Sequence, residues 1–445
     1  MRPGPLKAVF AFGAALVAAG TPAPGTLRTQ TPVGVPPASA PAAAPPITVQ
    51  PDEGSNLTIY LLTFGHGDLV WEKFGHNAIW VHDATAGTDV TYNWGMFDFN
   101  QPHFIRRFLS GNTQYWMDTI PLSAIMQEYR ARNRTVLAQE LNLTAAQKID
   151  LERFLEWNAM PQNQFYRYDY FRDNCSTRLR DALDRAVNGQ IRRATDTVRT
   201  ATTYRWHTAR LMADNIPIYT GIMLALGHRA DKPITAWEEM FLPVPMSARL
   251  RAVNIAGPDS TRIPLVRAER QLLGADRAPE RETPPNYLPL FVAVGLVTAA
   301  LILYLVRAGE SGSRAAAVFA GLLAGLWSLL SGFFGLVVVA AWLLTAHVFM
   351  GMNENLLQFN PLSFILAIMI PFGIGIGRLT RGLSRLATLI AMLSLLGFIM
   401  QGLPAWNQPN GEIIALALPL NLATAWAVYR LSHYKRISRS SSAER

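Results

Sequence analysis

The chain has 445 residues, of which 50% are hydrophobic and only 16% are charged. This composition excludes a disordered chain and argues against a purely soluble one. The net charge of +9 does not indicate a nucleic-acid partner, because it is confined to a few segments that flank apolar runs. These segments are Arg2 with Lys7, 307–314, 378–385 and 430–445. They carry a net charge of +10 together, so the net charge of the rest of the chain is −1. We therefore expect no nucleic acid to bind.

The N-terminus predicts export. Residues 1–7 are basic, and residues 8–20 form an apolar run of about a dozen residues, too short for a comfortable bilayer span. Residues 1–20 are therefore predicted to be a signal peptide or a retained N-terminal anchor. Residues 21–50 are rich in Pro, Ala and Thr, which is typical of an extended, disordered linker.

Five apolar runs follow the predicted exported domain, which covers residues 51–282. They predict an all-α transmembrane bundle with helices at 287–306, 315–346, 361–377, 386–402 and 411–429. With one tilted helix over the long second run, every basic loop lies in the cytoplasm, as does the tail 430–445. The loops 347–360 and 403–410 then lie outside, and neither contains Lys or Arg. The positive-inside rule favours this topology over a split second run.

The exported domain is predicted to be α+β. Runs rich in β-branched and aromatic residues predict strands at 57–65, 76–82 and 90–94, and residues 84–88 suit a hairpin loop. Thr144 and Gln147 have the spacing of a capping box and predict a helix over 149–157. A further helix is expected to start near Cys175. Residues 189–282 are expected to be helical and rich in loops, with packing residues at Trp237, Phe241 and 243–245.

Cys175 is the single cysteine of the chain, so it has no internal disulfide partner. Asp173 or Asn174 can cap the helix that follows it. A thiol in the first helical turn feels the positive end of the helix dipole, which predicts a lowered pKa. The alternative is a small buried side chain without chemistry, the usual fate of a free cysteine. The polar neighbours of Cys175 favour a nucleophile.

His76 stands at the start of a predicted strand, where it can take the proton from a thiol on a facing helix. Its orienting partner is expected on the neighbouring strand, where Tyr92, Asn93 and Trp94 are the choices and Asn93 is favoured. His66, in a Gly-rich turn, is the alternative base. His82 lies too far along the strand to join His76.

Metal and serine chemistry fit the sequence poorly. His66, Asp68 and His76 make at most a loose set of ligands, without the paired spacing of a zinc site. No Gly-x-Ser-x-Gly elbow occurs. We therefore expect no metal and no cofactor.

Five blocks of residues resemble the Lnb family of lipoprotein transacylases, over its N-terminal periplasmic domain: Phe74–Ile79, Tyr92–Phe99, Phe108–Gly111, Asn133–Arg134 and Tyr166–Asp181. The resemblance spans about residues 57–245 and extends weakly into the membrane part. It implies a permuted papain-like, NlpC-like domain in the periplasm, on a multi-pass protein of the bacterial inner membrane. It also implies Cys175 as nucleophile and His76 as base. His66 departs from the family pattern, which keeps it open as the alternative base.

The sequence thus predicts a thiol acyltransferase that moves an acyl chain within bacterial lipoproteins through a thioester, with membrane lipid or lipid-modified lipoprotein as partner. The backbone amide of Cys175 is the favoured oxyanion donor. One alternative is a cell-envelope cysteine hydrolase, a peptidoglycan peptidase or amidase, and another is a non-catalytic membrane scaffold. Slow labelling of Cys175 by thiol probes is expected to favour the scaffold.

Secondary site candidates surround these residues. Asp173, Asn174 and Arg178 flank the cysteine and are expected to support either the substrate or the structure. The loop 347–360 contributes His347, Asn353 and Asn355, which are expected either to cap a helix start in a wet loop or to line a lipid entrance beneath Cys175.

Overall fold

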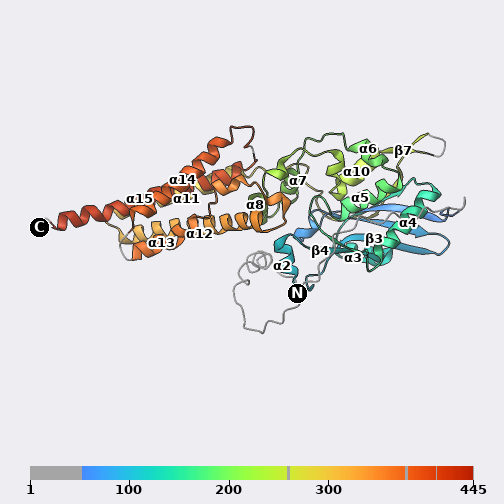
Figure 1. The fold of residues 1–445 in the computed structure, drawn as a ribbon, viewed down its shortest axis with the longest axis horizontal. Helices are drawn as coiled ribbons and strands as arrows, with labels where there is room; N and C mark the ends of the chain where they lie inside the picture. Colours follow the sequence, from blue (N-terminus) through green and yellow to red (C-terminus); the bar gives the residue numbers. More distant parts are fainter. Residues whose placement is uncertain (1–52, 258–260, 376–378, 407, 444–445) are drawn as a thin grey trace.

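The computed structural model describes residues 53–257, 261–375, 379–406 and 408–443. The predicted leader, 1–20, and linker, 21–50, lie outside the described residues. We call residues 53–286 the sheet domain and residues 287–443 the helical region. The two lie end to end, with the helical region extending away from the sheet domain toward the C-terminus (Figure 1).

A seven-stranded antiparallel sheet organises the sheet domain. Its order is β6-β4-β3-β2-β1-β5-β9. The three predicted strands are confirmed as its centre: β1 (Leu57–Phe64), β2 (His76–Asp83) and β3 (Thr88–Met96). Most of their side chains are buried, on both faces of the sheet. This burial explains why continuous runs of β-branched and aromatic residues mark these strands in the sequence.

Four further strands of the sheet carried no clear sequence signal: β4 (Gln114–Pro121), β5 (Val136–Leu141), β6 (Phe165–Arg167) and β9 (Val266–Leu273). The expectation that residues 189–282 are only helical and loop-rich is wrong at β9, which pairs with β5 at the sheet edge. Most of its side chains are exposed, so it lacks an apolar alternation. A separate two-stranded sheet pairs β7 (Asn254–Ala256) with β8 (Arg262–Pro264).

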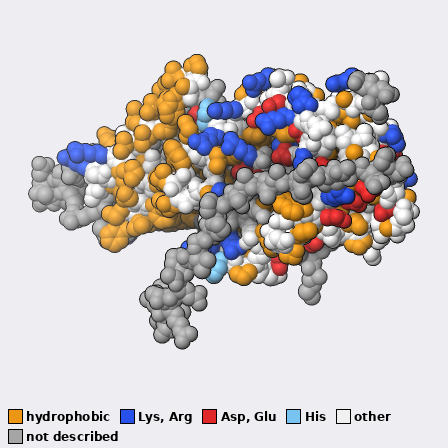
Figure 2. All heavy atoms as spheres, turned by 45° about the vertical axis from the view of Figure 1, so that its right-hand side comes forward, with side chains coloured by type: hydrophobic (Ala, Val, Ile, Leu, Met, Phe, Trp, Pro, Cys, Tyr) orange, Lys and Arg blue, Asp and Glu red, His pale blue; other side chains and the backbone are white. Residues whose placement is uncertain are grey.

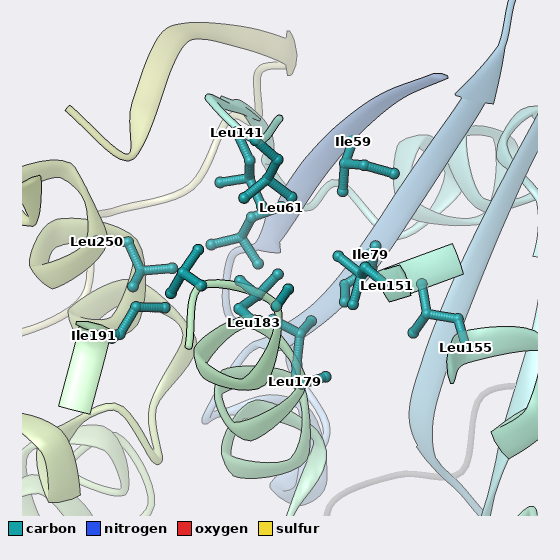
Figure 3. Close-up of a cluster of buried hydrophobic side chains, with 14 of the residues drawn as sticks. Ile59, Leu61, Ile79, Leu141, Leu151, Leu155, Leu179, Leu183, Ile191 and Leu250 are labelled. Atoms are coloured by element: carbon teal, nitrogen blue, oxygen red, sulfur yellow. The ribbon is translucent and has the colours of Figure 1, made fainter. Parts of the chain in front are cut away.

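Helix α5 (Cys175–Ala186) packs on one face of the sheet and carries the cysteine at its first position. Leu179 and Leu183 are fully buried against β1 and β2 residues such as Leu61 and Ile79 (Figure 3). Complete burial of a leucine contributes roughly 1.5–3 kcal/mol, so this contact holds the start of α5 against the sheet.

The other helices of the sheet domain surround this core. They are α2 (Phe104–Ser110), α3 (Leu122–Ala131), α4 (Ala145–Ala159), α6 (Gln190–Thr195), α7 (Tyr204–Leu211), α8 (Ile216–Ala225), α9 (Ala236–Glu239) and α10 (Pro243–Ala252), with short 3₁₀ turns η1 (Val70–Glu72) and η2 (His228–Asp231). The predicted capping box of Thr144 and Gln147 is present at the start of α4. Trp237 and Phe241, predicted as packing residues, are buried.

Among the residues that the structure describes, four helices are long and apolar enough to cross a membrane: α11 (Leu288–Glu310), α12 (Arg314–Leu344), α14 (Arg381–Met400) and the first part of α15 (Gly411–Ala443), up to Ser432. The remaining predicted span, 361–377, corresponds to α13 (Ser363–Gly375), which has 13 residues. Hydrophobic side chains cover the helical region, whereas charged side chains gather over the sheet domain and at the far end of the helices (Figure 2).

The ends of these helices alternate between the sheet domain and the far end of the molecule. Ala346, just after α12, donates its N–H to Ser110 O (2.8 Å), and Gln408, between α14 and α15, donates to Leu226 O (3.2 Å). At the far end, Arg430 pairs with Glu310 (2.5 Å). The loops without Lys or Arg therefore lie beside the sheet domain, on one side of the helical region, as the predicted topology requires.

This arrangement predicts the result of a labelling experiment. In a Cys175→Ala background, a cysteine at Leu403, which is exposed beside the sheet domain, should react with an impermeant maleimide in spheroplasts. A cysteine at Ser442 should react only after permeabilisation, because the basic tail is expected in the cytoplasm. Labelling of the Ser442 cysteine in intact spheroplasts would contradict the predicted topology.

Candidate active site

Asn174 begins the helix that presents the cysteine. Its side chain accepts a hydrogen bond from Thr177 N (2.9 Å), and its own N–H donates to Thr177 Oγ1 (2.8 Å), which forms a reciprocal cap. Of the two caps that the sequence allowed, Asn174 is the one used. The cap places Cys175 in the first turn of α5, where the backbone N–H groups have no carbonyl partner within the helix.

The other polar residues around the cysteine hold the loop that precedes it. Asn174 Nδ2 donates to Tyr170 O and Phe241 O, both at 2.9 Å. Arg178 donates to both carboxylate oxygens of Asp173 (2.5 and 2.8 Å) and lies 4.0 Å from the centre of the Tyr166 ring. Asp173, Asn174 and Arg178 are therefore engaged with the protein itself, which fits the structural alternative for these three residues.

The thiol of Cys175 lies half-buried against β2 and β3. Gly95 stands so close that a Cβ added there would lie 3.2 Å from Cys175 Cβ. The next residue, Ser176, donates through its hydroxyl to Asn77 Oδ1 (2.8 Å), which locks the start of α5 onto the start of β2. The backbone N–H groups of Asn77 and Ser176 favour the thiolate form.

Burial nevertheless dominates the ionisation of this thiol. The pKa of Cys175 is raised, because desolvation outweighs the stabilising backbone N–H groups. The sequence-based prediction of a lowered pKa is therefore wrong: the helix terminus acts as expected, but the apolar surroundings disfavour the charge more. At neutral pH the Cys175 side chain is therefore a neutral thiol.

This ionisation state predicts slow alkylation. Iodoacetamide should react with Cys175 more slowly than with free cysteine at neutral pH, and the rate should still be rising above pH 9, because the thiolate fraction follows the raised pKa. N-acetylcysteine provides the reference curve, and the alkylated peptide is quantified by mass spectrometry. A rate that is high and independent of pH between about 5 and 8 would show a thiolate–imidazolium pair instead.

His76 begins β2 and is oriented by the neighbouring strand. Its Nε2 lies 3.3 Å from Asn93 Oδ1, and Asn93 Nδ2 donates to Thr91 O (3.2 Å) and Thr91 Oγ1 (3.0 Å). Because both hydrogens of Asn93 Nδ2 are donated to Thr91, the Oδ1 atom of Asn93 faces the imidazole as an acceptor. Nε2 therefore carries the hydrogen, which leaves the Nδ1 lone pair available to take a proton.

The imidazole is held neutral. Burial and the positive charge of Arg134 together lower the pKa of His76 to about 4, against the opposing hydrogen bond to Asn93. The uncharged imidazole is the form that can accept a proton.

The thiol and the imidazole are not hydrogen-bonded to each other in the described structure. Along β2, Ile79 packs toward α5, whereas Ala78 packs toward α3, so strand alternation turns His76 to the α3 face. The sulfur lies against the backbone N–H of Asn77, the residue that follows His76 on β2. This contact brings the thiol to the same end of β2 as the imidazole.

His66 has different surroundings. Burial lowers its pKa, and the charges that act on it come from Arg277, Lys73, Arg134 and Asp214 rather than from Cys175. Asp68, the third residue of the loose ligand set, forms an ion pair with Arg277 (2.7 Å). Within the described residues no three His, Cys, Asp or Glu side chains gather at metal-binding distance.

The loop after α12 connects the helical region to the sheet domain. His347 Nε2 lies 3.0 Å from Phe108 O, and its ring stacks on Tyr170 at 5.7 Å. Asn353 donates to Leu224 O (2.8 Å) and Ala225 O (3.0 Å), and Asn355 donates to Leu224 O (3.0 Å). Both asparagines are buried, so they satisfy the C-terminal carbonyls of α8 rather than face a wet loop.

Sequence reasoning missed three features of this site. They are the Ser176–Asn77 bond, the close approach of Gly95, and two buried groups without a hydrogen-bond partner among the described residues, Arg134 Nη2 and the Tyr166 hydroxyl. The resemblance had already drawn attention to Arg134 and Tyr166 as part of its blocks. Only tertiary contacts show that their polar atoms are unsatisfied.

Gly95 offers a test of the tight packing at the thiol. Gly95→Ala should reduce turnover by about tenfold or more, because the added methyl displaces Cys175 and small misplacements of reacting groups are costly. Gly87→Ala is the matched control: both glycines have positive φ (90° and 65°), but nothing lies within 4 Å of a Cβ at Gly87. Both variants should lose about 1 kcal/mol of stability. Equal activity in the two variants would mean that Gly95 matters only for the backbone.

The comparisons with known proteins agree with the resemblance. Residues 50–210 match the family model of the Lnb N-terminal periplasmic domain. Over these residues the chain is similar to the Lnb N-terminal periplasmic domain. The matched segment includes Cys175, His76 and Asn93, and it ends within α7, so the helical region lies outside it. Searches of curated proteins and of solved structures each found no match.

Proposed function

We propose that this protein is a membrane-embedded thiol acyltransferase that acts on lipid-modified substrates and moves an acyl chain within bacterial lipoproteins. The observation that carries the proposal is the contact between the loop before Cys175 and the membrane part. Tyr170 stacks on His347, three residues after the long apolar helix α12 ends. A thiol at this position meets substrates presented at a bilayer surface, whereas a soluble peptide substrate needs no such placement.

The chemistry runs in two balanced steps. His76 Nδ1 takes the proton of Cys175 while the sulfur attacks an ester carbonyl, and the C–O bond then breaks as the proton passes to the glycerol oxygen. This step forms a thioester. An amine then attacks the thioester, gives its proton to His76, and releases the thiol as the C–S bond breaks. The product is an amide, and no cofactor takes part.

Asn93 and the backbone are assigned supporting roles in this proposal. Asn93 holds His76 as the Nε2–H tautomer through the 3.3 Å contact, so that Nδ1 is the base. The backbone N–H groups of Asn77, Cys175 and Ser176 surround the sulfur and are the proposed oxyanion donors. The order of His76 before Cys175, with the cysteine at a helix start against the sheet, supports a permuted papain-like domain.

The test is fragmentation mass spectrometry of lipoprotein N-termini, from cells with the protein, without it, and with Cys175→Ala. Transfer within one lipoprotein conserves mass, so the position of the acyl chain must be read from fragments. An N-acyl fragment that appears only with the wild-type protein supports the proposal. Release of free fatty acid without N-acylation would indicate a lipid hydrolase, and unchanged lipoproteins with cleaved cell-wall peptides would favour the peptidase alternative.

A further inference from the structure

A cluster of exposed and partly exposed apolar side chains lies beside the candidate site. We call it the aromatic surface and define it as Trp71, Phe97, Phe99, Phe104 and Ile105. Trp71 is 49% exposed, and Phe99 and Ile105 are each 56% exposed. Helix α2, which supplies two of these residues, has no buried side chain. Large apolar side chains that are exposed together mark an interaction surface.

The aromatic side chains form one continuous surface rather than scattered exposures. Phe99 lies against Trp71 (5.4 Å between ring centres), Phe97 (5.1 Å) and Phe104 (5.2 Å). Such edge-to-face contacts hold the rings in place without burying them. The surface is therefore preformed.

One end of this surface reaches the thiol. Phe97 follows Gly95 by two residues, and Gly95 is in close contact with Cys175. Phe97 also packs on Tyr115 (5.1 Å), which stacks on Tyr168 (4.2 Å). Tyr115, Tyr168 and Cys175 all pack against the same buried core, so the chain of rings ends beside the cysteine.

The other end reaches the apolar end of α12. Ser110 O, at the end of α2, accepts from Ala346 N (2.8 Å), and Phe108 O contacts His347 (3.0 Å). Leu343 and Leu344, the last residues of the candidate span, are 68% and 80% exposed. The apolar face of α12 thus ends two residues from its contact with α2, which lies where the sheet domain meets the helical region (Figure 1).

A cationic side chain lies next to this surface. Arg106, adjacent to Ile105 on α2, is exposed and has no ion-pair partner among the described residues. A free cation beside exposed apolar side chains is typical of the bilayer interface, where it meets lipid phosphates.

We propose that the aromatic surface is the binding track for the acyl chain of a bilayer lipid, leading from the end of α12 to Cys175. The proposal rests on the proposed function and names where the lipid substrate lies. α2 sits in the interfacial layer, its side chains contact an acyl chain of the lipid-modified substrate, and Arg106 meets the phosphates of the surrounding lipids.

Photo-crosslinking tests this track without requiring activity. The full-length protein is reconstituted in vesicles of phosphatidylcholine and phosphatidylglycerol that contain a phosphatidylcholine with a diazirine at the chain end. Crosslinked peptides are identified by mass spectrometry, in the wild type and in Cys175→Ala. Labelling should occur on residues 97–108 in both proteins and fall by roughly tenfold in Ile105→Asp, the effect expected from losing one buried apolar side chain. Trp157→Ala is the control, since Trp157 is also exposed (38%) but lies on α4, away from the helical region.

A kinetic comparison completes the test. Ile105→Asp should reduce acyl transfer in a diacylglyceryl-modified lipopeptide inserted in the vesicles by roughly tenfold and leave thioester formation from a short water-soluble ester unchanged. Absence of labelling on residues 97–108, with acyl-enzyme still formed from the lipopeptide, would overturn the track but leave the proposed function standing. Labelling in both proteins without any acyl-enzyme from the lipopeptide would retain the lipid-binding surface and reject the proposed function.

Discussion

Replacement of Cys175 by alanine or serine is expected to abolish acyl transfer, with a loss of about 10⁴-fold or more, the scale seen when a covalent nucleophile is removed. The thioester requires this sulfur, and the chain contains no other cysteine to replace it. The measurement is acyl transfer in a diacylglyceryl-modified lipopeptide presented in vesicles, together with the mass of the intact protein, which should show a hydroxylamine-sensitive acyl adduct only in the wild type.

The fold should survive both substitutions. Cys175 is half-buried and its helix is started by Asn174, so each variant should change the free energy of unfolding by only about 1 kcal/mol. Thermal unfolding in detergent checks this and separates lost chemistry from lost structure. A Cys175→Ala enzyme with wild-type turnover would exclude the thioester mechanism.

Replacement of His76 by alanine is expected to reduce turnover by at least about 10²-fold, the usual contribution of a general base. Because the folded-state pKa is about 4, the imidazole stays neutral, and activity should persist down to about pH 5 before it falls through pH 4. The pH dependence of kcat/KM, measured with a water-soluble ester, tests this limb. His66→Ala is the matched control, because burial also lowers the pKa of His66, whereas His76 alone of the two contacts Asn93 and precedes Asn77, whose backbone lies against the sulfur.

The lowered pKa of His76 also predicts how the free energy of unfolding depends on pH. The folded pKa of His76 lies below the unfolded value of about 6.5, so the unfolded chain binds more protons between these two values. The contribution of His76 to stability is therefore fully present above about pH 6.5 and is lost as the pH falls toward 4. Thermal unfolding across this range distinguishes acid inactivation from unfolding.

The two histidine variants also decide between the candidate bases. If His66→Ala reduces turnover and His76→Ala does not, His66 is the base.

The raised pKa of Cys175 also changes how the scaffold alternative is tested. Slow labelling by thiol probes was expected to mark an inert domain, but the buried neutral thiol makes slow labelling the expected result for an enzyme as well. Formation of the acyl adduct, rather than the labelling rate, separates the two. An acyl adduct is incompatible with a non-catalytic scaffold.

Local patterns in the sequence were sufficient for several features of this protein. The strands β1 to β3 follow from runs of β-branched and aromatic residues, and the start of α4 follows from the spacing of Thr144 and Gln147. The apolar helices of the membrane part follow from hydropathy and length alone. Each of these signals lies within one element, so no knowledge of distant contacts is needed.

Contacts between distant segments decided the rest. The edge strand β9 is recognisable only through its pairing with β5, since its side chains carry no apolar pattern. The pKa of Cys175 depends on the packing around it, which outweighs the helix terminus that the sequence revealed. Asn353 and Asn355 are satisfied by carbonyls of α8, more than 100 residues earlier in the chain. Burial and hydrogen-bond partners are properties of the packed molecule, so pairing, ionisation and the roles of polar loop residues emerge only in the tertiary structure.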